Sequence, residues 1–418
     1  MKYAEYKDSS VDWIGKVPIH WNIMRGKFIV KVLPGYAFDS KKFTSDEGIS
    51  LIRIRDINNT STEMNYYGSF NEEYIVNTGD VLVGMDGDFN VAKWKGERAL
   101  LNQRVCKIVG TNIMLSSYMY YLLSRPLKLI NDVCYATTVK HLSTSDIENS
   151  LFPVPTIQEQ HAIVAYLNEK CNKIDGAIDV QKKKIDLLNE LKQTIITNAV
   201  TKGLNPNAPM KDSGVELIGQ VPEHWEVKRL KFNSKFINGF AFKSDSFSDD
   251  GEYPVIRIGD IYNDGISYDN IVYVPLNSDL DNYKVRNNDI LIAMSGATVG
   301  KVGLCNSNDG GYINQRVGIV RSEIYKLIWY NLLSPKFLEY IYLMSDGSAQ
   351  PNISSKVIRD YYIAIPSHEE QQEIIEYLTK EVSKIDAQIS KANRRIELLN
   401  ELKQSIITEA VTGKIKVC

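Results

Sequence analysis

The sequence has few cysteines, and none of them has the spacing of a cysteine-based site. Its five cysteines include no pair separated by two residues, the arrangement typical of zinc ribbons and redox motifs. Long apolar runs are also absent, since no stretch approaches the roughly 18 residues needed to cross a membrane. The first ten residues lack the basic and apolar regions of a secretory signal. We therefore expect reduced thiols and a cytoplasmic protein.

A strong net charge is missing as well. The formal net charge is −2, which argues against a protein that wraps nucleic acid by charge alone. A local basic face, or a partner that supplies positive charge, remains open. Tyrosine is abundant, with 24 residues, and its rigid amphipathic ring suits recognition surfaces.

The motifs of common catalytic sites are incomplete. Gly296–Lys301 resembles a phosphate-binding loop, but it has three residues between its glycines and is followed by Val302 where a magnesium-binding Ser or Thr belongs. A glycine turn beside a strand explains it better. The Glu-x-Lys triplets at Glu190, Glu226 and Glu401 lack a partner aspartate on a strand, and the five histidines have no metal-binding spacing. We predict no catalytic residue and no metal site.

The chain contains an internal repeat, in which nearly the same sequence occurs twice. Residues 187–201 and 398–412 are identical at 13 of 15 positions, at an offset of 211 residues. Further matches join Asp8–Trp21 to Asp212–Trp225 and Asn102–Val105 to Asn314–Val317. A repeat of this length has the size of a domain rather than of a solenoid unit. The chain is therefore a tandem pair of one module.

The last part of each copy predicts a long helix. Thr156 with Glu159, and Ser367 with Glu370, form capping-box pairs, and Gly203 and Gly413 are suitable stops. Between them an apolar seam alternates steps of three and four over about five heptads, interrupted mainly by Lys192 and Lys403. The seam comprises Val164, Leu167, Cys171, Ile174, Ile178, Gln181, Ile185, Leu188, Lys192, Ile195 and Ala199, and in the second copy Ile375, Leu378, Val382, Ile385, Ile389, Ala392, Ile396, Leu399, Lys403, Ile406 and Ala410.

Upstream of each helix the pattern is that of a mixed globular domain. Ile52–Arg55 and the run from Ile256 alternate as half-buried strands do, and Val81–Val83 and Ile290–Ile292 are short apolar strands. Residues 118–123 and 325–333 have helical patterns that end at Ser-x-Pro or Ser-Pro. We predict an α+β fold with recognition domains at 1–155 and 204–366, the latter with its linker, and helices at 156–203 and 367–414.

The two helices are expected to pair as a coiled coil. The helices repeat without gaps whereas the globular parts contain insertions, because a heptad seam tolerates no slip. A two-fold repeat pairs its helices most simply about a pseudo-dyad, which makes them antiparallel. Parallel pairing remains the alternative, although it crowds the two globular domains together.

This combination resembles the specificity subunit of Type I restriction–modification systems. The resemblance covers the whole chain and depends on Ile-Gly-x-Val-Pro-x-His-Trp at Ile14–Trp21 and Ile218–Trp225, on Pro155–Gln160 and Pro366–Gln371, and on Leu-Lys-Gln-[Ser/Thr]-Ile-Ile-Thr at Leu191–Thr197 and Leu402–Thr408. It implies that each globular domain reads half of a split double-stranded DNA target. It further implies that the helices fix the half-site spacing and dock two modification subunits, which bring S-adenosylmethionine. Restriction or motor subunits would add ATP- and Mg-dependent translocation and cleavage. The chain itself would bind no cofactor and catalyse nothing.

Base reading needs exposed polar side chains and aromatic loops near the grooves. The candidates are side chains of recurring arginines, of two glycine–aromatic loops and of loops that differ between the copies, namely Arg53, Arg55, Arg257, Tyr36, Phe38, Lys41, Phe240, Phe242, Lys243, Asp86, Asn90, Lys140, His141, Ser295, Thr298, Gln350 and Asn352. Each of the three arginines could instead form an ion pair, for example with Asp56 or Asp260. Asn102–Arg104 and Asn314–Arg316 are identical in both copies, which fits a scaffold or phosphate contact better than base choice.

Partner docking is expected on the outer helix faces and around the Pro-x-His-Trp segments. The candidates are Trp21, Trp225, Gln160 and Gln371, although either tryptophan could simply cap its domain core. The alternative function is a coiled-coil scaffold with two protein-binding domains. It predicts no DNA sequence preference in any complex.

Overall fold

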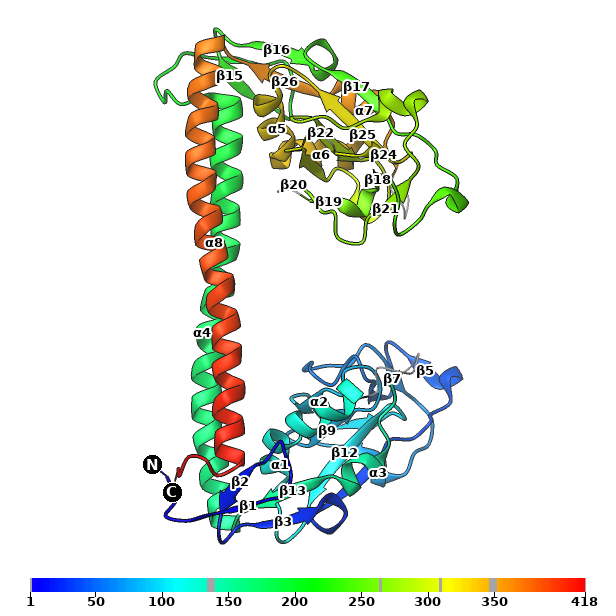
Figure 1. Ribbon diagram of the computed structural model, residues 1–418, viewed down its shortest axis with the longest axis vertical. Coiled ribbons are helices and arrows are strands. Elements are labelled where there is room, and N and C mark those ends of the chain that lie inside the picture. Colours follow the sequence, from blue (N-terminus) through cyan, green and yellow to red (C-terminus); the bar gives the residue numbers. More distant parts are fainter. Residues whose placement is uncertain (1, 134–139, 263–264, 308–309, 346–351, 418) are drawn as a thin grey trace. The chain divides into compact units, whose positions relative to one another are not determined.

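The computed structural model describes residues 2–133, 140–262, 265–307, 310–345 and 352–417. The chain forms two units, unit 1 comprising residues 1–181 with 394–418, and unit 2 comprising residues 182–393. Each unit holds one mixed α/β domain and segments of the two long helices (Figure 1). The α/β domain before residue 157 is called head 1, and that of residues 203–367 is called head 2.

Two long helices occupy the predicted positions. They are α4 (Ile157–Lys202) and α8 (His368–Val411). In unit 1, Asp175 of α4 contacts Lys403 of α8, while Trp21 beside the start of α4 lies next to Gly413 after the end of α8. The two segments therefore run antiparallel. Unit 2 has the same arrangement, because Lys192 contacts Asp386 and Gly203 lies next to Glu370. The prediction of antiparallel pairing is confirmed within each unit.

The predicted heptad seam coincides with the inner faces of the helices. Every seam position from Val164 to Ala199, and from Ile375 to Ala410, is buried or half-buried. The two lysines that interrupt the seam are each paired with an aspartate of the opposite helix, Lys192 with Asp386 and Lys403 with Asp175, both at 2.7 Å. The stops are also where they were predicted, since Gly203 and Gly413 have φ of 73° and 69°. Glycine enters this left-handed conformation without steric cost.

Head 1 contains two main sheets. Their strand orders are β10-β9-β12-β4 and β5-β7-β6-β11-β8, and two-stranded pairs β1-β2 and β13-β3 flank them. Among the described residues of head 1, all strand pairs are antiparallel except β11 with β6, which is parallel. The strands are β1 (Tyr6–Asp8), β2 (Lys16–Pro18), β3 (Asn22–Arg25), β4 (Val30–Pro34), β5 (Phe43–Thr44), β6 (Ile49–Ile52), β7 (Asn65–Tyr66), β8 (Ile75–Val76), β9 (Val81–Gly84), β10 (Val91–Lys93), β11 (Ala99–Leu101), β12 (Val105–Gly110) and β13 (Leu151–Val154).

Head 2 repeats this topology in its described residues. The order β23-β22-β25-β17 corresponds to the first sheet of head 1, and β21-β18-β24 contains the equivalent parallel pair, β18 with β24. The pairs β14-β15, β16-β26 and β19-β20 complete it. The strands are β14 (Met210–Asp212), β15 (Gln220–Pro222), β16 (Glu226–Arg229), β17 (Lys235–Asn238), β18 (Tyr253–Ile256), β19 (Ile261–Tyr262), β20 (Gly265–Ile266), β21 (Val272–Val274), β22 (Ile290–Ala293), β23 (Val302–Leu304), β24 (Tyr312–Ile313), β25 (Val317–Arg321) and β26 (Tyr362–Ile365).

Short helices complete both heads. The α-helices are α1 (Ser116–Leu122), α2 (Ser124–Val133) and α3 (Thr144–Asn149) in head 1, and α5 (Tyr325–Leu333), α6 (Pro335–Met344) and α7 (Ser355–Asp360) in head 2. The 3-10 helices are η1 (Gly26–Phe28), η2 (Ser40–Lys42), η3 (Glu72–Tyr74), η5 (Leu230–Phe232), η6 (Ser244–Ser246), η7 (Ile258–Asp260), η8 (Ser278–Tyr283) and η9 (Gly296–Thr298).

The predicted strand at Ile52–Arg55 is wrong. Strand β6 ends at Ile52, and the backbone turns there, with the Asp56 carboxylate accepting a 3.0 Å hydrogen bond from the Arg53 N–H. Ile54 nevertheless packs against the core from this turn. The alternating apolar pattern therefore arises because Ile52 is buried and Ile54 is partly buried, and not because the segment is a strand. The repeat-equivalent strand likewise ends at Ile256.

Each head is anchored to both long helices by its core. In unit 1 the core joins the first sheet and α1 to α4 and to the end of α8 through Ile163, Leu167, Ile407 and Ala410. In unit 2 the equivalent core includes Ile196 and Ala199 of α4 and Ile374 and Leu378 of α8. No helix in the described parts of the chain has the length and apolar character that crossing a membrane requires.

Candidate nucleic-acid interface

The Pro-x-His-Trp segment of unit 1 binds the first turn of α4. Trp21 is fully buried, and its indole N–H donates to the Glu159 carboxylate at 3.2 Å, while His20 Nε2 lies 2.9 Å from the same oxygen. Glu159 also accepts from the N–H and hydroxyl of Thr156, which completes the predicted capping box. Burial opposes ionisation of Glu159, but the hydrogen bonds from His20, Trp21 and Thr156 outweigh it and lower the pKa of the carboxyl.

Unit 2 contains the equivalent contacts, and in each unit the His-Trp pair with its glutamate is called the clamp. Trp225 Nε1 donates to Glu370 at 2.9 Å, and His224 Nε2 lies 2.8 Å from that carboxylate. The glycine that ends the opposite helix lies against each tryptophan, Gly413 against Trp21 and Gly203 against Trp225. Each clamp therefore joins the start of one long helix to the end of the other within a single unit.

The four predicted docking side chains lie inside the chain. Trp21, Trp225 and Gln160 have no exposed surface, and Gln371 is 8% exposed. Gln160 binds the backbone of Leu115 and Ile113, and Gln371 donates to the Pro366 carbonyl. In this conformation a partner could contact the exposed helix faces around these side chains, but not the side chains themselves. Docking near these segments stays a prediction.

Three loops of head 1 meet at an exposed cluster of polar side chains, the head 1 cluster of Asp86, Arg104 and His141. Arg104 Nη1 donates to Asp86 Oδ2 at 2.5 Å, and His141 Nδ1 lies 2.7 Å from Asp86 Oδ1. The Arg104 and His141 side chains are 54% and 56% exposed, whereas Asp86 is 22% exposed. Partial burial opposes ionisation of Asp86, but the bonds from His141 and Arg104 lower the pKa of its carboxyl, which keeps the cluster's anion charged.

The backbone holds these loops together through Met85. Its N–H donates to the Arg104 carbonyl at 2.9 Å, and its carbonyl accepts from Leu142 at 2.7 Å. Head 2 repeats this frame at Met294, whose N–H donates to Arg316 and whose carbonyl accepts from Ile353, both at 2.9 Å. The antiparallel bridge between Asp86 and His141 has its equivalent between Ser295 and Asn352.

The head 2 cluster consequently comprises Ser295, Arg316 and Asn352. Arg316 Nη1 donates to Asn352 Oδ1 at 3.3 Å. The arginine is common to both clusters, while the aspartate and histidine of head 1 are replaced by serine and asparagine. One backbone frame therefore presents a constant cation beside side chains that differ in charge and hydrogen-bonding pattern.

The glycine–aromatic loops, Gly35–Phe38 and Gly239–Phe242, lie beside the Asn-Gln-Arg segments that contain Arg104 and Arg316. Isolated parallel β-bridges pair Tyr36 with Asn102 and Phe240 with Asn314. Each asparagine precedes the arginine of its cluster by two residues. Gly35 and Gly239 permit this approach, because a Cβ at either position would collide with the carbonyl of the asparagine. Tyr36 is 50% exposed and packs on Phe38 and Tyr74, with ring centroids about 5 Å away.

The predicted arginines outside the clusters form ion pairs. Arg53 contacts Asp56 at 3.3 Å and Glu63 at 2.7 Å, and Arg55 lies 3.4 Å from Glu63. Arg257 lies 3.4 Å from Asp260 and donates to the Asn270 carbonyl. The ion-pair alternative is thus present in the structure for all three, and their contact with DNA stays a prediction.

The remaining candidates are dispersed. Lys41 and Lys243 are exposed beside the glycine–aromatic loops, Phe240 and Phe242 pack together with ring centroids 4.9 Å apart, and Thr298 is half-buried in η9. Gln350 lies outside the described residues.

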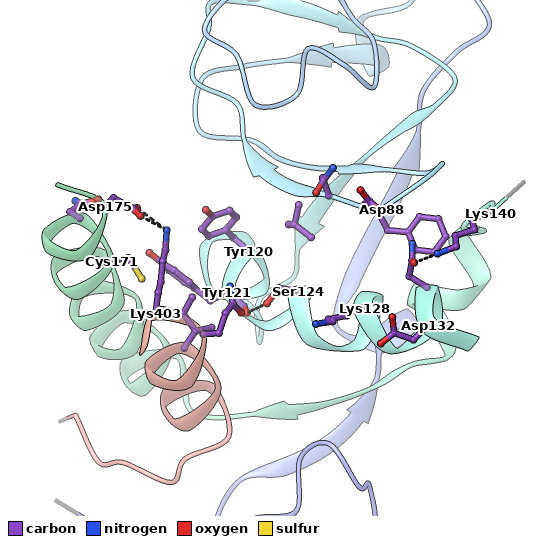
Figure 2. Close-up of a pocket in the computed structure, with 17 residues that line it drawn as sticks. Asp88, Tyr120, Tyr121, Ser124, Lys128, Asp132, Lys140, Cys171, Asp175 and Lys403 are labelled. Atoms are coloured by element: carbon purple, nitrogen blue, oxygen red, sulfur yellow. Dashed lines mark hydrogen bonds and ion pairs between the residues drawn. The ribbon is translucent and has the colours of Figure 1, made fainter. Parts of the chain in front are cut away.

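Asn90 and Lys140 line a cleft of about 560 Å³ in unit 1 rather than the head 1 cluster. Figure 2 shows Tyr120, Tyr121, Lys128 and Asp132 projecting from α1 and α2 toward this cleft, with Cys171, Asp175 and Lys403 on the long helices at its other side. Lys140 donates to Asn131 at 2.6 Å. The lining mixes cations, anions and tyrosines, so no single ligand charge is favoured. Elsewhere in the described chain, too, no group of three or more His, Cys, Asp or Glu is placed to hold a metal ion.

Sequence reasoning missed some of the contacts of two kinds of residue. The scaffold or phosphate contact expected of Arg104 and Arg316 stays a prediction, but the repeat alone does not show that Arg104 binds Asp86 and Arg316 binds Asn352. Glu159 and Glu370 were recognised only as capping residues, although each also binds the His-Trp pair. The His-Trp segments and the capping boxes both recur in the repeat. This shared recurrence was the signal that could have indicated binding between each glutamate and its His-Trp pair.

Comparison with known proteins supplies the context for this geometry. A family model described as the Type I restriction modification DNA specificity domain matches residues 18–193 and again residues 222–399. The EcoBI Type I restriction enzyme specificity subunit of Escherichia coli is 30% identical, over 96% of this chain and 88% of that protein. The MjaVIII specificity subunit of Methanocaldococcus jannaschii is 27% identical, over 96% of this chain and 94% of its own length.

A solved structure shares the fold. A chain from a study of complex assembly and conformational transition of the type I R-M system aligns with a TM-score of 0.68 over 96% of this chain and 99% of that chain. The two sequences are 18% identical, so this likeness concerns the fold alone.

Proposed function

Because the chain belongs to the family of Type I restriction modification DNA specificity domains, we propose that it reads one asymmetric, bipartite DNA target, with one half-site for each head. The observation that carries this proposal is the pair of clusters. Two equivalent backbone frames present the same arginine beside different polar neighbours, Asp86 and His141 in one head and Ser295 and Asn352 in the other. Two heads that share a backbone arrangement but present different hydrogen-bonding side chains are suited to two half-sites of different sequence.

The docking part of the proposal rests on the outer faces of the helices. Leu187 and Leu191 of α4 are 64% and 48% exposed, and their repeat equivalents Leu398 and Leu402 of α8 are 47% and 49% exposed. Residues four apart share one face of a helix, so each pair forms a small apolar patch. Two nearly identical patches suit two copies of one partner, which we propose to be methyltransferase subunits.

The chemistry belongs to those partners in this proposal. The methyltransferase subunits would bind S-adenosylmethionine, and restriction or motor subunits would use ATP and Mg. The chain would contribute recognition and assembly, would bind no cofactor, would catalyse no step and would act on DNA in the cytoplasm. Its small negative net charge is compatible with this role if the partners supply most phosphate contacts.

The test is co-expression of the chain with the methyltransferase subunit of its own system, followed by methylation sequencing of the host genome. The proposal predicts a stable complex and methylation at one split sequence whose halves differ. A stable complex without methylation at any defined sequence would instead favour a scaffold with two protein-binding heads. Absence of both the complex and the methylation would contradict the proposed function.

A further inference from the structure

In head 1 an arginine and a carboxylate are held side by side on the exposed surface of the three-loop cluster. Arg104 Nη1 lies 2.5 Å from Asp86 Oδ2, and His141 holds the other carboxylate oxygen at 2.7 Å. From this geometry we propose that Arg104 and Asp86 are a specificity-determining pair that reads a G·C base pair in the half-site of head 1. The inference rests on the function proposed above and names the base chemistry that one head selects.

The pair offers complementary groups to one base-pair edge. In the major groove, guanine presents two acceptors, N7 and O6, and the paired cytosine presents the N4 amino donor. Arginine is the common donor to the guanine edge, and a carboxylate accepts from cytosine N4. Arg104 has further guanidinium N–H groups beyond the one that binds Asp86, and its side chain is 54% exposed. A donor fork beside an acceptor therefore matches the edge of a G·C pair.

The same cluster is poorly suited to a phosphate. The pKa of the Asp86 carboxyl is lowered by His141 and Arg104, so the carboxylate is charged at neutral pH. A carboxylate in direct contact with Arg104 cancels most of the arginine's attraction for a backbone phosphate, and it repels the phosphate itself. Asp86 does assist a base-reading arginine, because it restricts the long side chain to one orientation before DNA arrives.

Head 2 provides the internal comparison. Arg316 contacts a neutral amide, Asn352, at 3.3 Å, and serine stands where head 1 has the carboxylate. The backbone frame through Met294 matches that through Met85. The two side chains beside the arginine can therefore be exchanged between heads with the loop geometry kept.

The experiment uses the full chain in its methyltransferase complex and reads the target by methylation sequencing. The exchange variant D86S/H141N gives head 1 the neighbours of head 2. We expect it to relax the requirement for one G·C pair in one half-site, with the other half-site unchanged. R104A should reduce discrimination at the same base pair by roughly 5- to 150-fold, which corresponds to the about 1–3 kcal/mol of a bidentate side chain–base contact.

The matched control is R98A, which removes another exposed arginine of head 1 that is paired with a carboxylate, that of Glu72. It should leave the target sequence unchanged. An equal loss of methylation at all sites in R104A, with the recognised sequence intact, would identify a phosphate contact and overturn the inference. An unchanged half-site in D86S/H141N would also overturn it.

The reverse exchange keeps the inference testable if the head 1 variant fails to fold. S295D/N352H should create a G·C requirement, or strengthen one, at a single position of the other half-site. If that variant methylates the original sequence unchanged, the inference is wrong. Failure of the proposed function is distinguishable from all these outcomes, because the unmodified complex would then methylate no split sequence.

Discussion

Lys403 of α8 donates to both carboxylate oxygens of Asp175 in α4, at 2.7 and 2.8 Å, and so a lysine in the apolar seam has a partner on the opposite helix. Its repeat equivalent, Lys192, pairs in the same way with Asp386. The two lysines in the heptad pattern thus form two copies of one interhelical ion pair. Polar groups in a seam specify alignment at some cost in stability.

The ion pair predicts a charge-swap result. Lys403→Asp should place two carboxylates together and lower the free energy of unfolding by about 1 kcal/mol, and adding Asp175→Lys should recover most of that loss. The coupling should be small, about 1 kcal/mol or less, because both side chains are partly exposed. Urea unfolding of the two single variants and the double variant measures it. Strictly additive effects would show that the pair contributes nothing to the alignment.

The clamp at the start of α4 predicts a pH-dependent effect. Glu159→Gln should destabilise the chain by about 1–3 kcal/mol at pH 7, because His20, Trp21 and Thr156 lose a charged acceptor. The pKa of Glu159 is lower in the folded chain than its ordinary value of 4.5. Its stabilisation is therefore present above that ordinary value and is lost as the pH falls through the lower, folded value.

Thermal unfolding across this acid range is the measurement. The difference between Glu159→Gln and the unmodified chain should shrink as the pH falls below 4.5. Glu169→Gln, on the exposed face of α4, is the control and should have little effect at any pH. A constant difference between the Glu159 variant and the unmodified chain would argue against a charged acceptor.

Two glycines of the long-helix segments predict opposite effects of the same substitution. Gly413→Ala should destabilise by about 1 kcal/mol or more, since φ is 69° and a Cβ would collide with Pro18. Gly176→Ala should stabilise by roughly 0.5–1 kcal/mol, because Gly176 lies within α4 and a Cβ there meets nothing within 4 Å. Both are read from the urea midpoint. If both variants changed the stability in the same direction, the assigned end of α8 would be contradicted.

Local patterns allowed the helices to be predicted closely, whereas the site depended on contacts between distant segments. The heptad positions and the glycine stops of α4 and α8 are properties of neighbouring residues, and they match the structure. Asp86, Arg104 and His141 belong to three different loops, so their meeting follows from sheet topology that no local pattern encodes. The sequence could indicate that two of these loops differ between copies, but not that Asp86 contacts both the constant arginine and His141.

The incorrect strand at Ile52–Arg55 has a related cause. Ile54 lies in a turn and is partly buried there. Because it is apolar and two positions after Ile52, the sequence has the same alternation as a half-buried strand. Similarly, Gln160 and Gln371 are buried with their side-chain amides bonded to the Pro155 and Pro366 carbonyls, and residue type alone does not predict these contacts.

The continuous helices predict that the target spacer can be altered. Helix α4 begins in unit 1 and ends in unit 2, and four residues inserted after Asp179 lengthen it by about 6 Å and rotate the remainder of the helix about its axis. We expect the methylated sequence to keep both half-sites but to require a different spacer, or methylation to be lost. Methylation sequencing measures the spacer. An unchanged spacer with normal methylation would contradict the role of the helices as a ruler.

The central claim, that each head reads its own half-site, is tested most directly by replacing head 2 with a second copy of head 1. Residues 8–155 would be inserted in place of residues 212–366, at junctions that match in the repeat. Methylation sequencing of a host carrying the complex should then show a target in which both halves are the half-site of head 1. A target that keeps its original second half-site would contradict the claim.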